Sequence, residues 1–270
     1  MFALLAGCPA NDPKPKAPSG TASTSSTKSA NAAAKPLAPL ERVAPTVDGG
    51  ATGDSMYDVA PFTPAGLALP EQAVRVELDG EHAKREGQPW SPASVAKDTV
   101  VLLVPVGDTY LAQVAALLAA LDDAGAKVWV KHPDAPLAFP VMLRDEPSFQ
   151  AWLDEPVPGK LRIVHREDGF ELQTNMGKLA GPDPNGPTVP VRGGKMDLKT
   201  LQAGLARIKG GFKNAPDYCV MPSFGMELAQ TARMLAPNYF TAETPYFETT
   251  CLVYPRPRAP DAGPVEAPKK

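Results

Sequence analysis

The chain has 270 residues and a formal net charge of −3, so it has room for one or two domains and no electrostatic basis for binding nucleic acid. Its 32 prolines are well above the average share, which indicates that much of the chain is not packed. No run of about eighteen apolar residues occurs, so no segment is expected to cross a bilayer.

The first eight residues end in Leu5-Ala6-Gly7-Cys8, which resembles the lipobox of bacterial lipoproteins. In that family the chain is cut before the cysteine, which then carries the lipid. The resemblance implies that residues 1–8 are the remnant of a signal peptide and that Cys8 anchors the protein to a bacterial membrane, in a leaflet that stays open. The basic region that opens such signals is missing, so either the natural start lies upstream or the match is a chance one.

Residues 9–70 are rich in Ala, Pro, Ser, Thr and Lys. Few large apolar side chains occur there, so the segment cannot bury enough surface to offset its ordering entropy. We expect a flexible or semi-extended tether. The Pro-rich residues 256–270 are expected to form a disordered tail.

A first module is expected at residues 71–158, around the apolar and β-branched run 99–104. Such a run predicts a strand that is buried on both faces. Pro105 and Gly107 are expected to end this strand. Asp108 or Thr109 then follows as a candidate N-cap for a helix.

That helix is indicated by five apolar residues that share one face at a period of 3.6: Leu111, Val114, Ala115, Leu118 and Leu121. Gly125 ends it, and residues 127–130 read as the next strand. A short β-α-β crossover of this kind favours parallel strands. A further strand at 139–143 and a short helix at 148–153 complete the module.

The same pattern occurs a second time. Setting residues 102–118 above residues 219–235 without a gap aligns six identical residues in seventeen positions. The short strand 74–77 likewise resembles 161–164. We interpret this as two copies of one small α/β module, although any two strand-turn-helix units share Leu and Ala.

The second module is expected at residues 159–255. A hairpin is indicated by two apolar segments around Glu167-Asp168-Gly169. The remaining elements are a short strand at 188–191, a helix at 198–208 after Asp197, a strand at 217–221, a helix at 228–235 and a closing strand at 250–254. The predicted order is therefore β-β-α-β-α-β, and the predicted fold class is α/β with mixed sheets.

This order, with the Asp168-Gly169 turn and the helical leucines from Leu201, resembles the periplasmic domain of the ExbD/TolR family of biopolymer-transport proteins. The resemblance covers most of residues 160–255 and, more weakly, 74–131. Family members carry a transmembrane helix with an aspartate that serves a proton-driven motor; this chain lacks both, so that role is not carried over.

What the resemblance implies is a non-enzymatic accessory or binding component of the periplasm. Its partners would be envelope proteins, such as those of an ExbB/ExbD-like or TolQ/TolR-like complex. Two copies of the module in one chain could also pair with each other. Neither the partner nor the pathway follows from the sequence.

The alternative is a cell-wall hydrolase. Ser94-Val95-Ala96-Lys97 resembles the S-x-x-K motif of serine penicillin-binding enzymes, in which a lysine takes the proton of the nucleophilic serine. The downstream K-T-G element of that family does not occur, and its S-x-N element occurs only upstream, at residues 29–31. A serine-capped short helix with a surface lysine is the interpretation that these four residues favour, because a motif with two fixed positions arises easily by chance.

No metal or cofactor is expected. His82, His132 and His165 are far apart in the sequence, whereas metal binding needs a converging set, so we interpret all three as surface residues. Residues 192–195, Arg-Gly-Gly-Lys, lack the first glycine and the Ser/Thr of a phosphate loop and read as a plain turn.

If Cys8 is lipidated, Cys219 and Cys251 are left. They lie near the starts of two strands that a right-handed crossover would set parallel and side by side. Neighbouring strands are about 4.8 Å apart, which allows a disulfide, and an oxidising envelope would preserve it. Two small buried thiols that fill strand positions remain the other interpretation.

Overall fold

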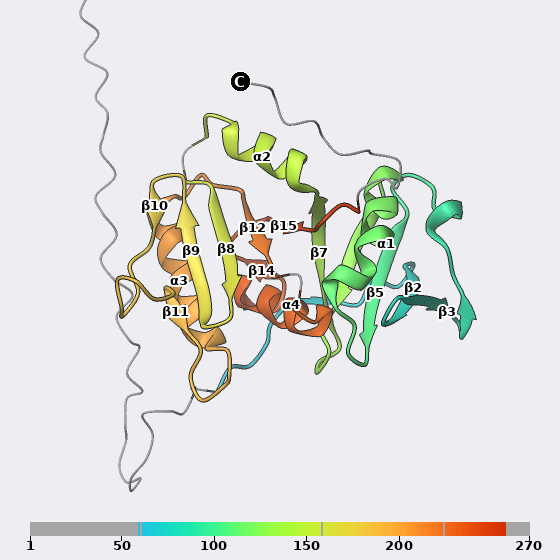
Figure 1. The fold of residues 1–270 in the computed structure, drawn as a ribbon, viewed down its shortest axis with the longest axis horizontal. Helices are drawn as coiled ribbons and strands as arrows, with labels where there is room; N and C mark the ends of the chain where they lie inside the picture. The colour runs from blue at the N-terminus through green and yellow to red at the C-terminus, as the bar shows by residue number, and fades with distance from the viewer. Residues whose placement is uncertain (1–58, 60, 158, 224, 258–270) are drawn as a thin grey trace, which may run out of the picture. The chain divides into compact units, whose positions relative to one another are not determined.

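The computed structural model describes residues 59, 61–157, 159–223 and 225–257 (Figure 1). The chain divides into two units, residues 1–35 and 36–270, and all described residues belong to the second. Cys8 and the expected tether up to residue 58 therefore lie outside the described residues. Within the described part, no helix combines the length and hydrophobicity needed to span a membrane.

The fold is mixed α/β, as predicted. Its helices are α1 (Leu111–Asp123), α2 (Glu146–Asp154), α3 (Leu198–Gly211) and α4 (Leu228–Leu235), with 3-10 turns η1 (Pro92–Ser94) and η2 (Ala236–Asn238). The longer strands are β2 (Val74–Asp79), β3 (His82–Arg85), β5 (Val100–Val106), β6 (Lys127–Lys131), β7 (Leu137–Arg144), β8 (Leu161–Arg166), β9 (Gly169–Thr174), β12 (Asp217–Met221) and β15 (Thr249–Val253). The short strands are β1 (Leu67–Ala68), β4 (Gln88–Pro89), β10 (Gly177–Lys178), β11 (Val189–Pro190), β13 (Tyr239–Thr241) and β14 (Thr244–Pro245).

Thirteen of these strands form one sheet in the order β10-β9-β8-β12-β15-β7-β6-β5-β2-β3-β4, with β1 beside β7 and β11 beside β9. Figure 1 shows this order from the yellow β9 to the blue-green β3. The expected module boundary at residues 158–159 does not interrupt the sheet, because β15 pairs with β7. The two-module division therefore stays a prediction, within a sheet that both halves share.

The two faces of the sheet are covered differently. On the first face, which we call the helix face, the buried side chains of α1, α3 and α4 join the main core, for example Leu118, Leu205 and Leu235. On the opposite, outer face, α2 packs Phe149 and Trp152 against the β12 and β15 strands. Strand alternation explains the division, because successive side chains point to opposite faces.

Most predicted elements are present with small shifts in their ends. In α1 the buried residues are the five that the 3.6 period predicted, and Gly125 follows with a positive φ of 64°, which suits a glycine after a helix. The second half runs β8, β9, α3, β12, α4, β15, the predicted order of its main elements. Asp197 caps α3 through the Thr200 N–H at 3.0 Å.

Two local predictions were wrong. The β5 strand continues through Pro105, which pairs with Leu78 of β2, because proline removes a donor without preventing an extended backbone. It ends at Val106, directly before Gly107, so only the proline was misplaced as an end. Neither Asp108 nor Thr109 caps α1. Tyr110 takes that place, and its N–H donates to the Gln113 side chain at 2.9 Å.

Thr109 instead supports the β2–β5 pair. Its buried hydroxyl lies 2.9 Å from the Leu78 carbonyl and accepts the Gly80 N–H at 3.0 Å. The residue therefore holds the turn after β2 rather than the start of the helix. A threonine hydroxyl can satisfy backbone groups either at a helix N-cap or at a turn. The sequence around Thr109 could not show which of these two roles it has.

The two halves repeat one strand register. In the first half, Val74 of β2 is paired with Val101 of β5. In the second, Leu161 of β8 is paired with Tyr218 of β12. Leu161 follows Val74 by 87 residues (161 − 74), and Tyr218 follows Val101 by 117 residues (218 − 101). These are the offsets at which the sequence alignment matches the two halves.

Described structure extends past both expected boundaries, into residues assigned to the tether and to the tail. Leu67 and Ala68 form β1, which pairs with Ala138 and Leu137 of β7, so ordered chain begins before residue 71. At the other end, Arg256 is bound by carboxylates of the folded part. Pairing with the central strand and charge contacts hold these segments although their composition is poor in large apolar residues.

The outer face has a buried cation beneath α2. The Lys160 ammonium donates to the Trp152 carbonyl and to the Glu155 carboxylate, and it lies 4.6 Å from the centre of the Trp152 ring. The Trp152 indole N–H donates to Asp217 at 2.7 Å. These contacts fix the C-terminal end of α2 against the starts of β8 and β12.

Candidate functional site

The central strand β7 lies between β15 and β6 and is paired with them over different parts of its length. Its residues 138–141 pair with β6, and residues 142–144 pair with β15. Pro140 lies at this change and brings no N–H donor, a property that central strands rarely tolerate. The neighbouring strands therefore separate around the middle of β7.

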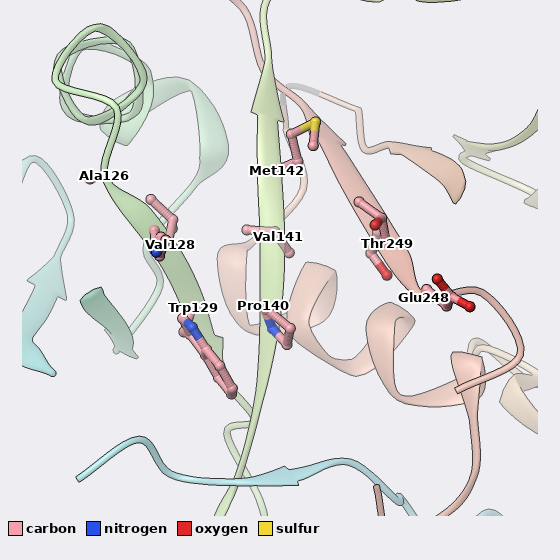
Figure 2. Close-up of a pocket in the computed structure, with 10 residues that line it drawn as sticks. Ala126, Val128, Trp129, Pro140, Val141, Met142, Glu248 and Thr249 are labelled. Carbon is pink, nitrogen blue, oxygen red and sulfur yellow. The ribbon is translucent and has the colours of Figure 1, made fainter. Parts of the chain in front are cut away.

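A cleft of about 440 Å³ occupies this separation. Its lining comes from the start of β6, the middle of β7 and the start of β15: Ala126, Lys127, Val128, Trp129, Pro140, Val141, Met142, Glu248, Thr249 and Thr250. Figure 2 shows β7 in the middle, with Trp129 on one side and Glu248 and Thr249 on the other. The ten lining residues include no cysteine or histidine; their polar side chains belong to Lys127, Trp129, Glu248, Thr249 and Thr250.

Apolar side chains remain open to solvent in this cleft. The Met142 side chain is 47 % exposed, and Trp129 is half-buried. Lys127 and Glu248 supply opposite charges at the two sides, and Lys127 also pairs with Asp98 at 3.2 Å. A groove with apolar walls and few polar groups is the usual form of a site that binds a ligand or a peptide segment.

Carboxylates gather where β6 and β7 diverge. Asp122 and Asp123 end α1, and Asp145 caps α2 through the Ser148 N–H at 3.0 Å. Hydrogen bonds from Ser148 lower the pKa of Asp145, whereas burial raises the pKa of Asp122. Arg256 lies among all three carboxylates.

A second, smaller hollow lies over β2 and β3. It has a volume of about 280 Å³ and polar walls formed by Ala73, Arg75, Glu77, Arg85 and Glu86. Arg75 pairs with Glu77 at 3.4 Å. The charges in this hollow compensate each other, so it offers less to a partner than the central cleft does.

The two residues of the hydrolase alternative, Ser94 and Lys97, both lie on the surface. Ser94 ends η1 and is exposed, and Lys97 is also exposed. It is Ser91 that caps η1, accepting the Ala93 N–H at 3.4 Å. The Lys97 side chain lies over Gly125, with its Cγ 3.3 Å from the position of a β-carbon there. A base within about 3.2 Å of the serine, which this chemistry needs, is not among the contacts of the described Ser94.

The expectation of three surface histidines was wrong for His132. His82 is exposed, but His132 is 3 % exposed, and its Nδ1 accepts the Asp134 N–H at 3.1 Å. Burial lowers the pKa of the His132 imidazole. The ring lies edge-on to Phe139 of β7, with the ring centroids 6.1 Å apart, a contact that a single histidine in the sequence does not reveal.

His165 is half-buried, and burial lowers its pKa too. Its Nδ1 lies 3.0 Å from the Ser223 hydroxyl. The pair joins the ends of β8 and β12, 58 residues apart, so sequence spacing could not indicate it. Within the described chain, no group of three or more His, Cys, Asp or Glu residues is arranged to hold a metal ion.

The two strand cysteines are bonded to each other. Cys219 and Cys251 are register partners in the parallel β12–β15 pair, and their Cα atoms are 4.4 Å apart. Both are buried on the outer face beneath Phe149 and Trp152 of α2. Of the two interpretations that the sequence left open, the structure contains the disulfide.

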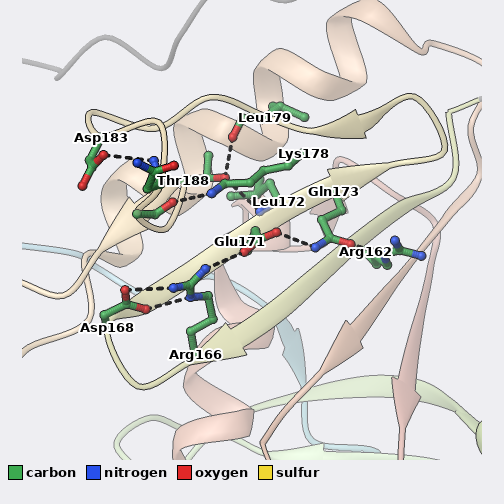
Figure 3. Close-up of polar contacts among 12 residues, drawn as sticks. Arg162, Arg166, Asp168, Glu171, Leu172, Gln173, Lys178, Leu179, Asp183 and Thr188 are labelled. Carbon is green, nitrogen blue, oxygen red and sulfur yellow. Dashed lines mark hydrogen bonds and ion pairs between the residues drawn. The ribbon is translucent and has the colours of Figure 1, made fainter.

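The turn residues have structural uses. Arg192 and Lys195 form an antiparallel bridge around two glycines with positive φ, so this segment is a turn, as predicted. On the β8–β9 hairpin, Arg166 pairs with Asp168 at 2.9 Å and with Glu171 at 3.0 Å (Figure 3). These ion pairs compensate the carboxylates of the hairpin internally.

Two features of the central site were absent from the sequence-based prediction. The cleft depends on which strands lie beside β7, and this pairing is not encoded in local periodicity. Pro140 in the middle of an apolar strand run was the available signal. Arg256 was placed in the expected tail, and its role depends on carboxylates more than a hundred residues away.

Comparison with known proteins adds no family: no family model, no curated protein and no solved structure matches the chain.

Proposed function

We propose that the protein is a lipid-anchored component of the bacterial cell envelope, related to ExbD/TolR transport systems, that acts by binding another envelope protein rather than by catalysis. Lipidated Cys8 would hold it to the membrane, and the folded part would face the periplasm. The buried Cys219–Cys251 disulfide supports an oxidising compartment. The β-β-α-β-α-β order of the second half supports the family resemblance.

The observation that carries the binding role is the central cleft. Trp129, Pro140 and Met142 present apolar surface in a hollow between strands, although burial would be favourable for each of them. An extended apolar segment of a partner fits such a site, because strands on both sides can contact alternate side chains of the segment. The threonines at the start of β15 add hydroxyl groups for orientation.

The proposal also includes pairing of the two modules within one chain. The shared sheet and the repeated strand registers support it. Such pairing would leave one central cleft per chain, between the halves, rather than one cleft per module.

Photo-crosslinking in cells that produce the full-length protein tests the binding role. A photoreactive amino acid is placed at position 142, and the control carries it at Met176, which is 61 % exposed but distant in sequence from the cleft. We expect a covalent adduct with an envelope protein from position 142 only, and loss of this adduct after Trp129→Ala. Equal labelling from both positions, or no adduct at position 142, would contradict the proposal.

A further inference from the structure

Residues 254–257 follow β15 and reach the ends of α1 and β7. The last β6–β7 register pair is Val128–Val141. If these antiparallel strands stayed paired for four more residues, Ala124 (128 − 4) would lie opposite Asp145 (141 + 4). The Arg256 side chain lies at this end, between Asp123 and Asp145.

Arg256 contacts both sides of the opening. Its two Nη atoms donate to the Asp123 carboxylate at 3.1 and 2.9 Å. Its Nε lies 2.8 Å from the Asp145 carboxylate. Asp123 is the last residue of α1, which leads into β6, and Asp145 lies between β7 and α2. One guanidinium therefore ties together the two strands that diverge to form the cleft, with the fork geometry that a lysine cannot reproduce.

Tyr254, two residues before Arg256, makes more deeply buried contacts. Tyr254 is buried, its N–H donates to the Arg144 carbonyl at 3.0 Å, and its hydroxyl donates to Asp122 at 2.9 Å. By contrast, the Arg256 side chain is 39 % exposed. Tyr254 therefore has contacts with the folded part that do not depend on Arg256, although the Arg256 guanidinium also donates to the Tyr254 hydroxyl at 3.3 Å.

We propose that Arg256 is a releasable clamp that limits how far β6 and β7 separate beyond the end of the central cleft. The clamp is ionic and solvent-accessible, so salt weakens it. Its release lets the start of β6 and the middle of β7 move apart, which admits a longer segment of the partner. This inference rests on the proposed binding role of the cleft.

Hydrogen exchange of the full-length protein, read by mass spectrometry, tests the clamp. The variants are Arg256→Ala and Arg256→Lys. The matched control is Arg233→Ala, because Arg233 binds Asp134 through a similar fork at 2.7 and 3.1 Å, at the other end of the β6–β7 hairpin. Its side chain is 34 % exposed, close to that of Arg256.

We expect Arg256→Ala to speed exchange at least about tenfold in residues 125–128 and 141–143, and Arg256→Lys to give part of this effect. High salt should speed exchange there in the parent protein and not in Arg256→Ala. The Arg233→Ala control should leave both segments unchanged. Unchanged exchange in Arg256→Ala would overturn the clamp, and so would an increase spread evenly through β5 and β8, because that is global destabilisation.

Failure of the clamp and failure of the binding role have different signatures. Faster local exchange without any crosslink from position 142 would retain the clamp and reject the binding partner. A crosslink whose yield is the same in the parent and in Arg256→Ala, with unchanged exchange, would retain the binding role and reject the clamp.

Discussion

Tyr110 and Glu227 face each other in an antiparallel bridge that joins the starts of α1 and α4. The Leu111 N–H donates to the Met226 carbonyl at 3.0 Å, and the Leu228 N–H donates to the Thr109 carbonyl at 2.7 Å. The two residues of the bridge are 117 positions apart (227 − 110), the offset of the sequence alignment. The contact thus has the self-complementary form of an interface between two copies of one surface.

The helical faces of the two halves should be equally important for stability. Leu118 and Leu235 are both buried in the main core, so Leu118→Ala and Leu235→Ala should each lower the free energy of unfolding by about 2–5 kcal/mol. Urea unfolding measures both values. Leu117, which is only partly buried, is the control, and Leu117→Ala should cost less. Near-neutral values for the two buried leucines would contradict the packing of these faces.

The disulfide should stabilise the second half. It joins residues that are 32 positions apart, a loop for which the chain-entropy model gives about 3–4 kcal/mol. The double variant Cys219→Ala and Cys251→Ala should therefore unfold at lower urea concentration than the parent. Mass spectrometry of non-reduced peptides checks the bond itself. Two free thiols in protein isolated from the envelope would argue against both the bond and the compartment.

The free energy of unfolding should decrease at acidic pH because histidines that are buried in the folded protein bind protons more readily in the unfolded chain. Burial lowers the pKa of His132 in the folded protein, so the unfolded chain, with a histidine pKa of about 6.5, binds the proton more readily. The stabilising effect is therefore complete above about pH 6.5 and is lost as the pH falls through that value toward the folded pKa. Urea midpoints at several pH values measure this loss.

The variant His132→Asn should flatten part of that pH dependence, and the rest should come from His165, whose pKa burial also lowers. His82→Asn is the control, because His82 is exposed. An unchanged slope in His132→Asn would show that protonation of this ring is not linked to unfolding.

Ser94 should not behave as an activated nucleophile. It is exposed at the end of η1, and acylation needs a base in hydrogen-bond reach. A fluorescent β-lactam should therefore leave the protein unlabelled. Labelling that disappears in Ser94→Ala would support the hydrolase and reject a purely binding role.

The lipid anchor can be checked on protein made with an extended natural start. Such protein should partition with membranes, and Cys8→Ser should release it. Stable anchoring needs more than one acyl chain, since one chain binds only marginally. A parent protein that stays soluble would refute the lipoprotein interpretation.

Local periodicity predicted the elements well because the fold uses it directly. The apolar face of α1 follows from a 3.6 period, and the Asp168-Gly169 turn follows from residues that tolerate a tight hairpin. The parallel β12–β15 pair, and with it the position of Cys219 beside Cys251, followed from crossover handedness.

The site itself was beyond such reasoning because it depends on distant pairings. The cleft exists because β7 meets β15 and β6 along different parts of its length, and no local pattern encodes which strands become neighbours. The contact of Arg256 with Asp123 spans 133 residues. The burial of His132 was missed because it depends on how the chain folds around one ring, against Phe139 for example, and not on the spacing of histidines.

The position of β15 has a consequence for how the protein is made. Among the strands of the described chain this one comes last, yet it lies in the interior of the sheet, between β12 and β7. Until it is synthesised, the facing edges of β12 and β7 stay open to pairing with other chains. The sheet that both halves share is therefore complete only after residues 249–253 have been made, and a chain that stops before Thr249 should be prone to aggregate.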